Sequence, residues 1–232
     1  MIIKVENLGE IKLLSNPRAR KIIVRKKQEY LQLTHPSSMT EDYIRRAIEE
    51  MKPRLLKLLQ QSSAKLLLTP ETTFKTFSFE LKIIESSTTN NYYLKLKDGL
   101  LTISCPVNTQ YDAPSVQKTL REMVDKTLRY EANRLFPSKI DKLSALYNFS
   151  YSTLTINKSR TRWGSCSSKQ SINLSYYCML LPEYLVDFVI LHELCHTREM
   201  NHGERFWKLL DSVTSGKAKE LTKELRAYKT NW

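Results

Sequence analysis

The chain has 232 residues, and its 37 Lys and Arg against 24 Asp and Glu give a formal net charge of +13. This length suits one large domain or two small ones, and an apolar fraction of 41% can build a hydrophobic core, which excludes a disordered chain. Five glycines and eight prolines exclude a collagen-like chain, and the lack of a stretch of about 20 apolar residues excludes an integral membrane protein. Lys4 and Glu6 interrupt the first apolar residues, so no signal peptide is predicted, and we expect a cytoplasmic protein without a membrane partner.

Four widely spaced cysteines argue against two classes of small protein. Because they form no C-x-x-C pair, neither a disulfide scaffold nor a structural zinc knuckle is indicated, and we expect reduced thiols in or near the core. The four are Cys105, Cys166, Cys178 and Cys195. The positive charge would attract nucleic acid, acidic lipid or acidic protein, but it does not by itself indicate a fold or a chemistry.

The first third of the chain alternates short apolar stretches with basic residues. This period of two predicts strands over residues 2–5 and 11–14 and at the apolar pairs within 22–33. Ser38-Met-Thr-Glu41 resembles a capping box, and apolar residues then recur at helical spacing up to Leu59. A helix broken or kinked at Pro53 is therefore expected to follow the strands.

Three further strands are predicted over residues 74–84, 92–96 and 100–107. The last two are expected to form a hairpin at Asp98-Gly99, because this dipeptide favours the left-handed conformations of a tight turn. After this hairpin, the spacing of the apolar residues changes from that of strands to that of helices. We therefore expect a strand-helix-strand region over residues 1–108 and a second, catalytic domain over residues 109–232.

The second domain is expected to be rich in helices. Apolar residues from Val116 to Leu135 follow a proline at a helix start and predict a long amphipathic helix. Two antiparallel strands, over 151–157 and 172–176, are expected to flank a polar loop. Pro182 opens an apolar helix, and two shorter helices are predicted over 204–213 and 217–228. Without an apparent internal repeat, this order predicts an α+β protein.

Three of the four histidines lie within eleven residues, beginning with His192-Glu-Leu-Cys-His196. On a helix, residues four apart are about 6 Å apart on one face, so these two imidazoles can bind one tetrahedral ion. Glu193 lies about 100° further round the helix than His192, where its carboxylate can reach a metal-bound water without being a ligand. The spacing therefore indicates a metal site with an adjacent base.

His202 requires the chain to turn back. In a continuous helix it would lie about 15 Å along the axis from His192 and about 9 Å from His196, far beyond a zinc–nitrogen bond of about 2.0–2.1 Å. The helix must therefore end before His202. Asn201 tolerates the left-handed conformation of a helix end, and Gly203 supplies a second flexible point.

Three protein ligands would leave the fourth position of a tetrahedral ion for water, which is typical of a catalytic zinc site. A carboxylate such as Glu204 is an alternative third ligand in place of His202. The almost wholly apolar run over 185–191 indicates that the helix before the site is enclosed on most sides.

Several short motifs resemble the YgjP-like family of bacterial metallopeptidase-type proteins, which are relatives of the SprT-like zinc proteases. The similarity is most specific over about residues 155–210. It rests on His192-Glu-Leu-Cys-His196, Asn201-His202, Phe206-Trp207, Arg162-Trp-Gly-Ser-Cys-Ser167 and Ile172-Asn-Leu174.

The resemblance implies a zincin-like core, in which an active-site helix packs under a small antiparallel sheet. It also implies that His192, His196 and His202 bind one zinc ion and that Glu193 is the general base. Metzincins share the spacing of the third histidine, but they have a glycine where this chain has Glu199, so metzincin membership is not assigned.

The segment around Trp163 and Gly164 has two interpretations. It is either a packed loop, with Trp163 in the core and Gly164 in a turn, or an edge strand that pairs with an extended substrate. In the second case Arg160 or Arg162 would hold a substrate carbonyl or carboxylate. Tyr176 or Tyr177 would stabilise the oxyanion, and these four residues are the candidate substrate-binding residues.

The sequence therefore predicts a zinc-dependent metallopeptidase that hydrolyses peptide bonds of a protein or peptide substrate through a zinc-activated water. A zinc-dependent RNA hydrolase is one alternative, because a bacterial endoribonuclease family shares the histidine spacing and the net charge would suit RNA. That family has glycine in place of Glu193. A basic nucleic-acid-binding module with structural zinc is another alternative. The SprT-like relation adds the hypothesis of a protease recruited to DNA by its basic N-terminal part.

Overall fold

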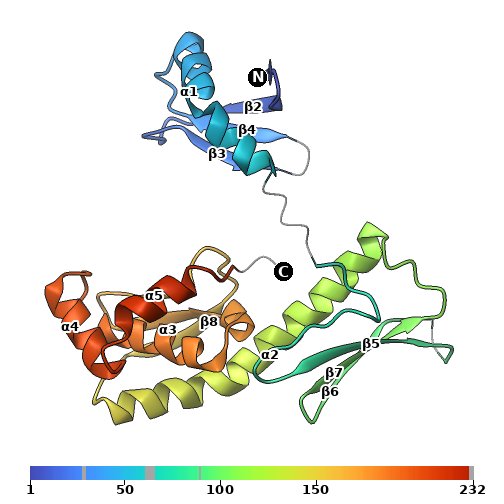
Figure 1. The fold of residues 1–232 in the computed structure, drawn as a ribbon, viewed down its shortest axis with the longest axis vertical. Helices are drawn as coiled ribbons and strands as arrows, with labels where there is room; N and C mark the ends of the chain where they lie inside the picture. Colours follow the sequence, from blue (N-terminus) through green and yellow to red (C-terminus); the bar gives the residue numbers. More distant parts are fainter. Residues whose placement is uncertain (28–29, 61–65, 89, 230–232) are drawn as a thin grey trace. The chain divides into compact units, whose positions relative to one another are not determined.

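The computed structural model describes residues 1–27, 30–60, 66–88 and 90–229, and the chain forms two compact units, Met1–Ala64 and Lys65–Trp232 (Figure 1). The boundary expected near residue 108 falls inside the second unit. Leu101 and Ile103 before that position share one hydrophobic core with Leu120 and Val124 after it. A common core joins both sides of residue 108, because neither side buries its apolar face alone.

The first unit is a four-stranded sheet that packs against one helix. Ile11, Leu31 and Leu33 of the sheet are buried against Ile44 and Ile48 of the helix, as the two periodicities predict. The sheet has the strand order β1-β2-β4-β3. Its elements are β1 (Ile2–Val5), β2 (Gly9–Ser15), β3 (Ile23–Lys26), β4 (Leu31–His35) and α1 (Glu41–Gln60).

Helix α1 begins later than a cap at Ser38 would require. The side chain of Thr40 accepts a hydrogen bond from the backbone N–H of Tyr43 at 3.4 Å, and its carbonyl accepts one from Ile44. Thr40 is therefore the N-cap. The prediction of a capping box that starts at Ser38 is wrong, because the helix begins two residues later. Pro53 lies inside the helix, which continues as one element past this position.

The second unit begins with a three-stranded sheet followed by a long helix. The hairpin at Asp98-Gly99 is confirmed, since both residues have the positive φ of such a turn (50° and 75°). The strand expected from residue 74 begins only at Glu80, because the hydroxyl of Thr76 accepts the N–H groups of Ser78 and Phe79 and forms a turn. The elements are β5 (Glu80–Ser86), β6 (Tyr93–Lys97), β7 (Leu100–Pro106) and α2 (Pro114–Leu146).

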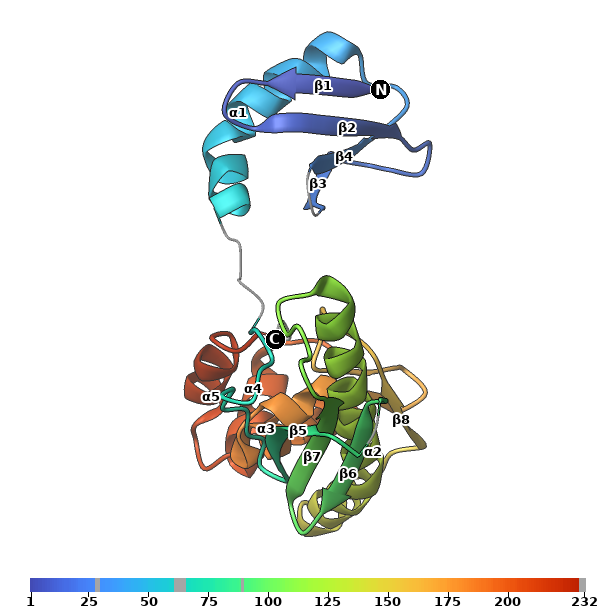
Figure 2. The same cartoon turned by 90° about the vertical axis from the view of Figure 1, so that its right-hand side faces the viewer.

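Helix α2 links the two halves of this unit (Figure 2). A row of residues four apart is fully buried along it, which is why one face can pack against the β5-β7-β6 sheet and against the later helices. The row is Leu120, Val124, Leu128, Ala132, Phe136 and Ile140. The helix runs past the predicted end at Leu135 and through Pro137.

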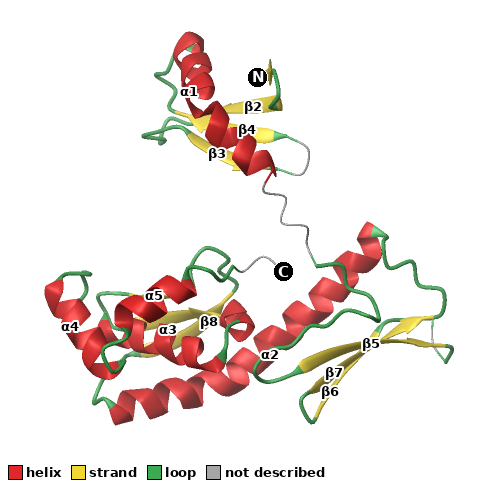
Figure 3. Ribbon diagram, in the orientation of Figure 1, coloured by secondary structure: helices red, strands yellow, loops and turns green. Residues whose placement is uncertain are grey.

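A second small sheet follows, coloured yellow next to α3 in Figure 3. It has the order β8-β10-β9, with β8 (Thr153–Asn157), β9 (Gly164–Cys166) and β10 (Ser171–Ser175). The prediction of two antiparallel strands is wrong, because β8 and β10 are parallel. The intervening segment, expected to be a loop, contains β9, which runs back antiparallel to β10 and forms the edge of a mixed sheet.

The three sheets have the same pattern of strand connections, although the sequence has no apparent internal repeat. In each, the first and third strands of a set are parallel neighbours, and the middle strand is antiparallel on the other side of the third. The sets are β2-β3-β4, β5-β6-β7 and β8-β9-β10. A helix follows each third strand. In the strand orders of the three sheets, β9 has the same edge position as β3 and β6.

The remaining elements are helical. They are the 3₁₀ helix η1 (Tyr176–Leu180), α3 (Glu183–Cys195), α4 (Glu204–Val213) and α5 (Ala218–Leu225). Helix α3 is enclosed as expected, with nine of its 13 residues buried. Three of the four cysteines are buried, and all four are free thiols, as predicted. In the described part of the chain, no helix has the length and apolarity needed to cross a bilayer.

One ion-pair cluster fastens α3 to α2. Lys139 of α2 is 17% exposed, and its ammonium group lies 2.9 Å from Asp187 and 2.7 Å from Glu183. We expect Lys139→Ala to lower the free energy of unfolding of the second unit by about 1–2 kcal/mol, because the half-buried Asp187 carboxylate loses its cation. Exposed Lys142→Ala on the same helix should change it little. All three tryptophans lie in this unit, so urea unfolding followed by tryptophan fluorescence measures the difference, and equal midpoints would contradict the expectation.

Candidate metal and active site

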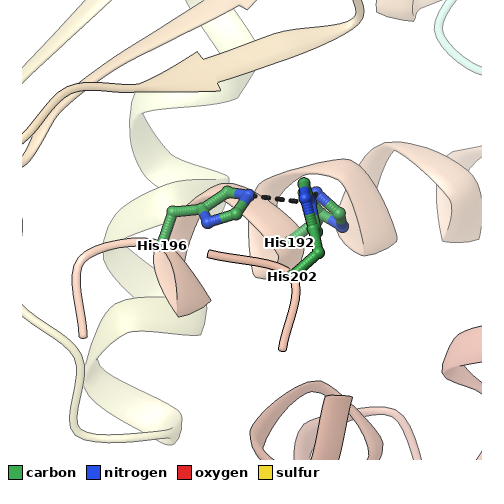
Figure 4. Close-up of side chains that lie close together, drawn as sticks. All are labelled: His192, His196 and His202. Atoms are coloured by element: carbon green, nitrogen blue, oxygen red, sulfur yellow. Dashed lines mark hydrogen bonds between the residues drawn. The ribbon is translucent and has the colours of Figure 1, made fainter. Parts of the chain in front are cut away.

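The three clustered histidines of α3 and the segment after it face one another (Figure 4). The Nε2 atom of His202 lies 3.1 Å from Nε2 of His196 and 3.1 Å from Nε2 of His192. One ring nitrogen of each residue lies within 4.8 Å of the others. Two nitrogens on a tetrahedral zinc ion are about 3.3 Å apart, so these donors fit one such ion.

The turn that brings His202 to the other two is made without a left-handed residue. Helix α3 ends at Cys195, and the N–H of Glu199 donates to the carbonyl of Cys195 at 2.9 Å, which closes a tight turn. The left-handed conformation expected at Asn201 is wrong, since Asn201 is not among the positive-φ residues of the described chain, and Gly203 has a φ of −81°. The predicted end of the helix before His202 is confirmed.

The imidazole of His196 is held in one orientation. Its Nδ1 lies 3.0 Å from the carbonyl oxygen of Glu199, so Nδ1 carries the proton and the lone pair of Nε2 points toward the other rings. Phe206 of α4 is fully buried and lies against all three imidazoles, at ring-centre distances of 5.0 Å from His192, 4.5 Å from His196 and 4.7 Å from His202. These contacts restrict the rings in the way that supports metal ligands in proteins.

Burial also sets the protonation of the cluster. Burial, together with the neighbouring imidazoles of His196 and His202, lowers the pKa of His192 to about 3. Burial lowers the pKa of His196 as well. Both rings are therefore neutral near pH 7, and a neutral imidazole has the lone pair that a metal requires.

Glu193 lies beside the histidines as a buried carboxyl group, 6% exposed. Its Oε2 has no hydrogen-bond partner in the described chain, and burial raises its pKa to about 8. A cation among the neighbouring imidazoles would counteract this effect by favouring the carboxylate. His192 and Glu193 line one cavity, and an unpartnered buried oxygen at such a position fits a site that receives a metal and a water molecule.

Gly164 of β9 provides the space for Glu193. A Cβ atom at Gly164 would lie 2.7 Å from both Cγ and Oε1 of Glu193, which is closer than real side chains approach. One interpretation of the sequence places Gly164 in a turn. Gly164 does not have a positive φ, so its role is not to form a turn. The edge strand and the candidate base are therefore in direct contact. A sequence shows a glycine but not what lies opposite, so this contact could not be found from the motif.

The other candidate residues gather around Asp125 of α2. The hydroxyl of Tyr177 donates to Asp125 at 3.1 Å, and the hydroxyl of Tyr176 donates to Tyr177 at 3.4 Å. The guanidinium of Arg160 lies 4.4 Å from the centre of the Tyr177 ring and 3.7 Å from Asp125. The fourth candidate, Arg162, is exposed and is not part of this group. It lines a polar cavity of about 280 Å³, and Gly164 lines the same cavity. The structure thus brings three of the four together, around a carboxylate that the sequence did not indicate.

Gly164→Ala is expected to lower peptide hydrolysis by about 10- to 100-fold without loss of bound metal, because the added methyl group must displace Glu193. The control is Gly203→Ala, where a Cβ meets no atom within 4 Å. Rates and elemental analysis of both variants test this. Unchanged hydrolysis by Gly164→Ala would show that the position of Glu193 is not critical.

The sequence matches the YgjP-like, metallopeptidase domain family over residues 20–228. The chain belongs to the YgjP-like metallopeptidase family. It is therefore an enzyme of the zinc metallopeptidase class, a hydrolase whose substrates are proteins or peptides. No curated protein sequence matches the chain significantly.

Two crystal structures of metallopeptidase zymogens are similar to part of the YgjP-like chain. Abylysin of Pyrococcus abyssi is 20% identical, and the match covers 39% of this chain and 91% of abylysin with a TM-score of 0.36. Jannalysin of Methanocaldococcus jannaschii is 22% identical, and the match covers 39% of this chain and 93% of jannalysin with a TM-score of 0.35.

Proposed function

We propose that this YgjP-like chain hydrolyses peptide bonds with one zinc ion held by His192, His196 and His202 and with Glu193 as the general base. The observation that carries the proposal is the convergence of three Nε2 atoms. It is supported by Glu193, which lines one cavity with His192 and whose buried Oε2 has no partner in the described chain. The alternative third ligand is disfavoured, since Glu204 is 81% exposed and pairs with Lys208 at 2.7 Å.

A zinc ion bound there supplies Lewis acidity, which lowers the pKa of water from about 15.7 toward about 7 and polarises the scissile carbonyl. Glu193 takes a proton from the attacking water at its free oxygen and later gives this proton to the leaving amine. Because Glu193 is only 6% exposed, few bulk water molecules can reach the carboxyl group that carries this proton.

Substrate binding is proposed to use β9. This strand forms the edge of its sheet, with β10 on one side only, and its Gly164 lies against Glu193. An extended substrate added to that edge would run past the base, held by main-chain hydrogen bonds. Arg162, beside this strand, is proposed to hold a substrate carbonyl or carboxylate. Oxyanion stabilisation by Tyr176 or Tyr177 stays a prediction, because both hydroxyls are engaged with each other and with Asp125.

The test of the proposal compares two substrates. Metal-depleted protein is reloaded with zinc and given casein or labelled RNA under the same conditions. Casein should be cleaved only after reloading, and RNA should stay intact. Cleavage of RNA alone would replace the proposal by a zinc-dependent RNA hydrolase, and a zinc content without turnover of either substrate would favour a structural ion.

Recruitment to DNA is proposed for the first unit. Six of the ten residues from Arg18 to Lys27 are Lys or Arg, and part of this segment forms β3, one of the two edge strands of its sheet. Full-length protein should bind duplex DNA at low salt, and Arg18→Ser with Arg20→Ser and Lys21→Ser should weaken binding and reduce its salt dependence. Removing Lys82, Lys95 and Lys97 of the second unit is the matched control. No binding at low salt would end this hypothesis.

A further inference from the structure

A cavity of about 170 Å³ lies beside the candidate base and is lined by both His192 and Glu193. Its other walls come from three places in the fold. Trp163 precedes β9, Phe188 and Val189 lie one turn before the metal ligands on α3, and Leu225 comes from α5.

These walls are apolar. The polar residue opposite α3 is Thr222, and its hydroxyl donates to the carbonyl of Ala218 at 2.6 Å, so it is already engaged within α5. Glu193 is the one carboxylate among the lining residues, and no Lys or Arg of the described chain is among them. A negatively charged side chain placed there would lose its hydration without gaining a cation, and a positively charged one would have as its partner only Glu193, the candidate base.

The wall formed by α5 is anchored to α3. The hydroxyl of Tyr184, in the first turn of α3, donates to the carboxylate of Glu224, next to Leu225. Leu221, one turn earlier on α5, packs against the main core instead of lining the cavity. A hydrogen bond thus joins α5 to α3 next to the cavity, and the volume of the cavity can be compared with the size of a side chain.

An apolar cavity of about 150 Å³ can hold a benzene molecule. A cavity of about 170 Å³ is therefore large enough for the side chain of leucine or phenylalanine. Because it adjoins Glu193, a side chain that fills it belongs to a residue next to the scissile bond.

We propose that this cavity is the specificity pocket of the enzyme and that it selects a substrate with an uncharged, leucine- or phenylalanine-sized side chain beside the cleaved bond. This inference rests on the proposed function. Leu225 and Thr222 then determine size selectivity, although they lie 23 and 20 residues after His202, the last of the three histidines. One methylene group in such a pocket changes selectivity by about 10- to 200-fold.

Binding of amino-acid hydroxamates to zinc-loaded full-length protein tests the pocket without turnover. Acetohydroxamate, which has no side chain, measures access to the metal alone. Leucine and phenylalanine hydroxamates should bind at least about tenfold more tightly than glycine hydroxamate, and aspartate hydroxamate should bind no better than glycine hydroxamate. Equal binding of the four amino-acid hydroxamates would overturn the assignment of the pocket while leaving the proposed metal site intact. Failure of acetohydroxamate to bind would instead defeat the proposed function, and the pocket with it.

Substitutions in α5 test which residues determine the selectivity of the cavity. Leu225→Ala should shift the preference from leucine toward phenylalanine by about tenfold, and Thr222→Leu should reduce the advantage of both over glycine. Leu221→Ala is the matched control on the same helix, and it should leave the order of the ligands unchanged. A change with Leu221→Ala as large as with Leu225→Ala would overturn the assignment. Mass spectrometry of casein digests should show the same shift in the residues beside the cleaved bonds.

Discussion

Glu193→Gln is expected to lower peptide hydrolysis by at least about 100-fold and up to about 10,000-fold, with metal content unchanged. The amide has the shape of the carboxylate but cannot take a proton from water. Glu193 lies outside the set of three converging Nε2 atoms, so its replacement leaves the proposed ligands in place. The measurements are the rate of casein cleavage and the metal content of the purified variant.

Glu199→Gln is the matched control for this substitution. Glu199 contacts His196 through its main-chain carbonyl, which the substitution retains, so the variant should keep both metal and activity. Full activity of metal-replete Glu193→Gln would remove Glu193 from the mechanism. Loss of metal from the same variant would make Glu193 part of the metal site.

His196→Ala and His202→Ala are each expected to abolish hydrolysis and to weaken metal binding by more than the 10- to 100-fold typical of outer contacts. Each substitution removes one of three converging nitrogens and leaves two imidazoles that cannot enclose a tetrahedral ion alone. Titration with zinc and a competing chelator measures the affinity. Because Phe206 packs against both rings, a melting curve of each metal-free variant separates loss of ligand from loss of fold.

His35→Ala is the control for histidine removal. His35 lies outside the cluster, at the end of β4 in the first unit, and its Nδ1 lies 2.8 Å from the carbonyl of Pro36. Its replacement should change neither metal affinity nor hydrolysis. Normal zinc affinity in His202→Ala, combined with loss of affinity in Glu204→Ala, would transfer the third ligand to Glu204.

Local spacing was sufficient for much of the candidate site. The four-residue interval between His192 and His196 predicts two imidazoles on one face of a helix, and the distance argument for His202 predicts that the helix ends before it. Both inferences concern neighbours in sequence, where helix geometry determines position. The route of the turn was less predictable, since a closed turn at Glu199 and a left-handed Asn201 both satisfy the same distances.

Strand pairing shows where local patterns stop being informative. Alternation of apolar residues correctly indicated strands near 153–157 and 171–175, because it reports which face is buried. It carries no information on which strand lies next to which, so the parallel pairing of β8 with β10 was missed. The three residues of β9 are too few to show alternation, and only pairing with β10 makes them a strand.

By itself, the sequence predicted most of the helices and strands and the spacing of the candidate metal-binding motif, because helix spacing and tight turns depend on residues within a few positions of one another. Only the tertiary structure decided what surrounds that motif. It placed Gly164 against Glu193, Phe206 beneath the three imidazoles and Leu225 beside the base. These contacts join residues from separate elements, and such neighbours result from packing one shared core, to which no short stretch of sequence corresponds.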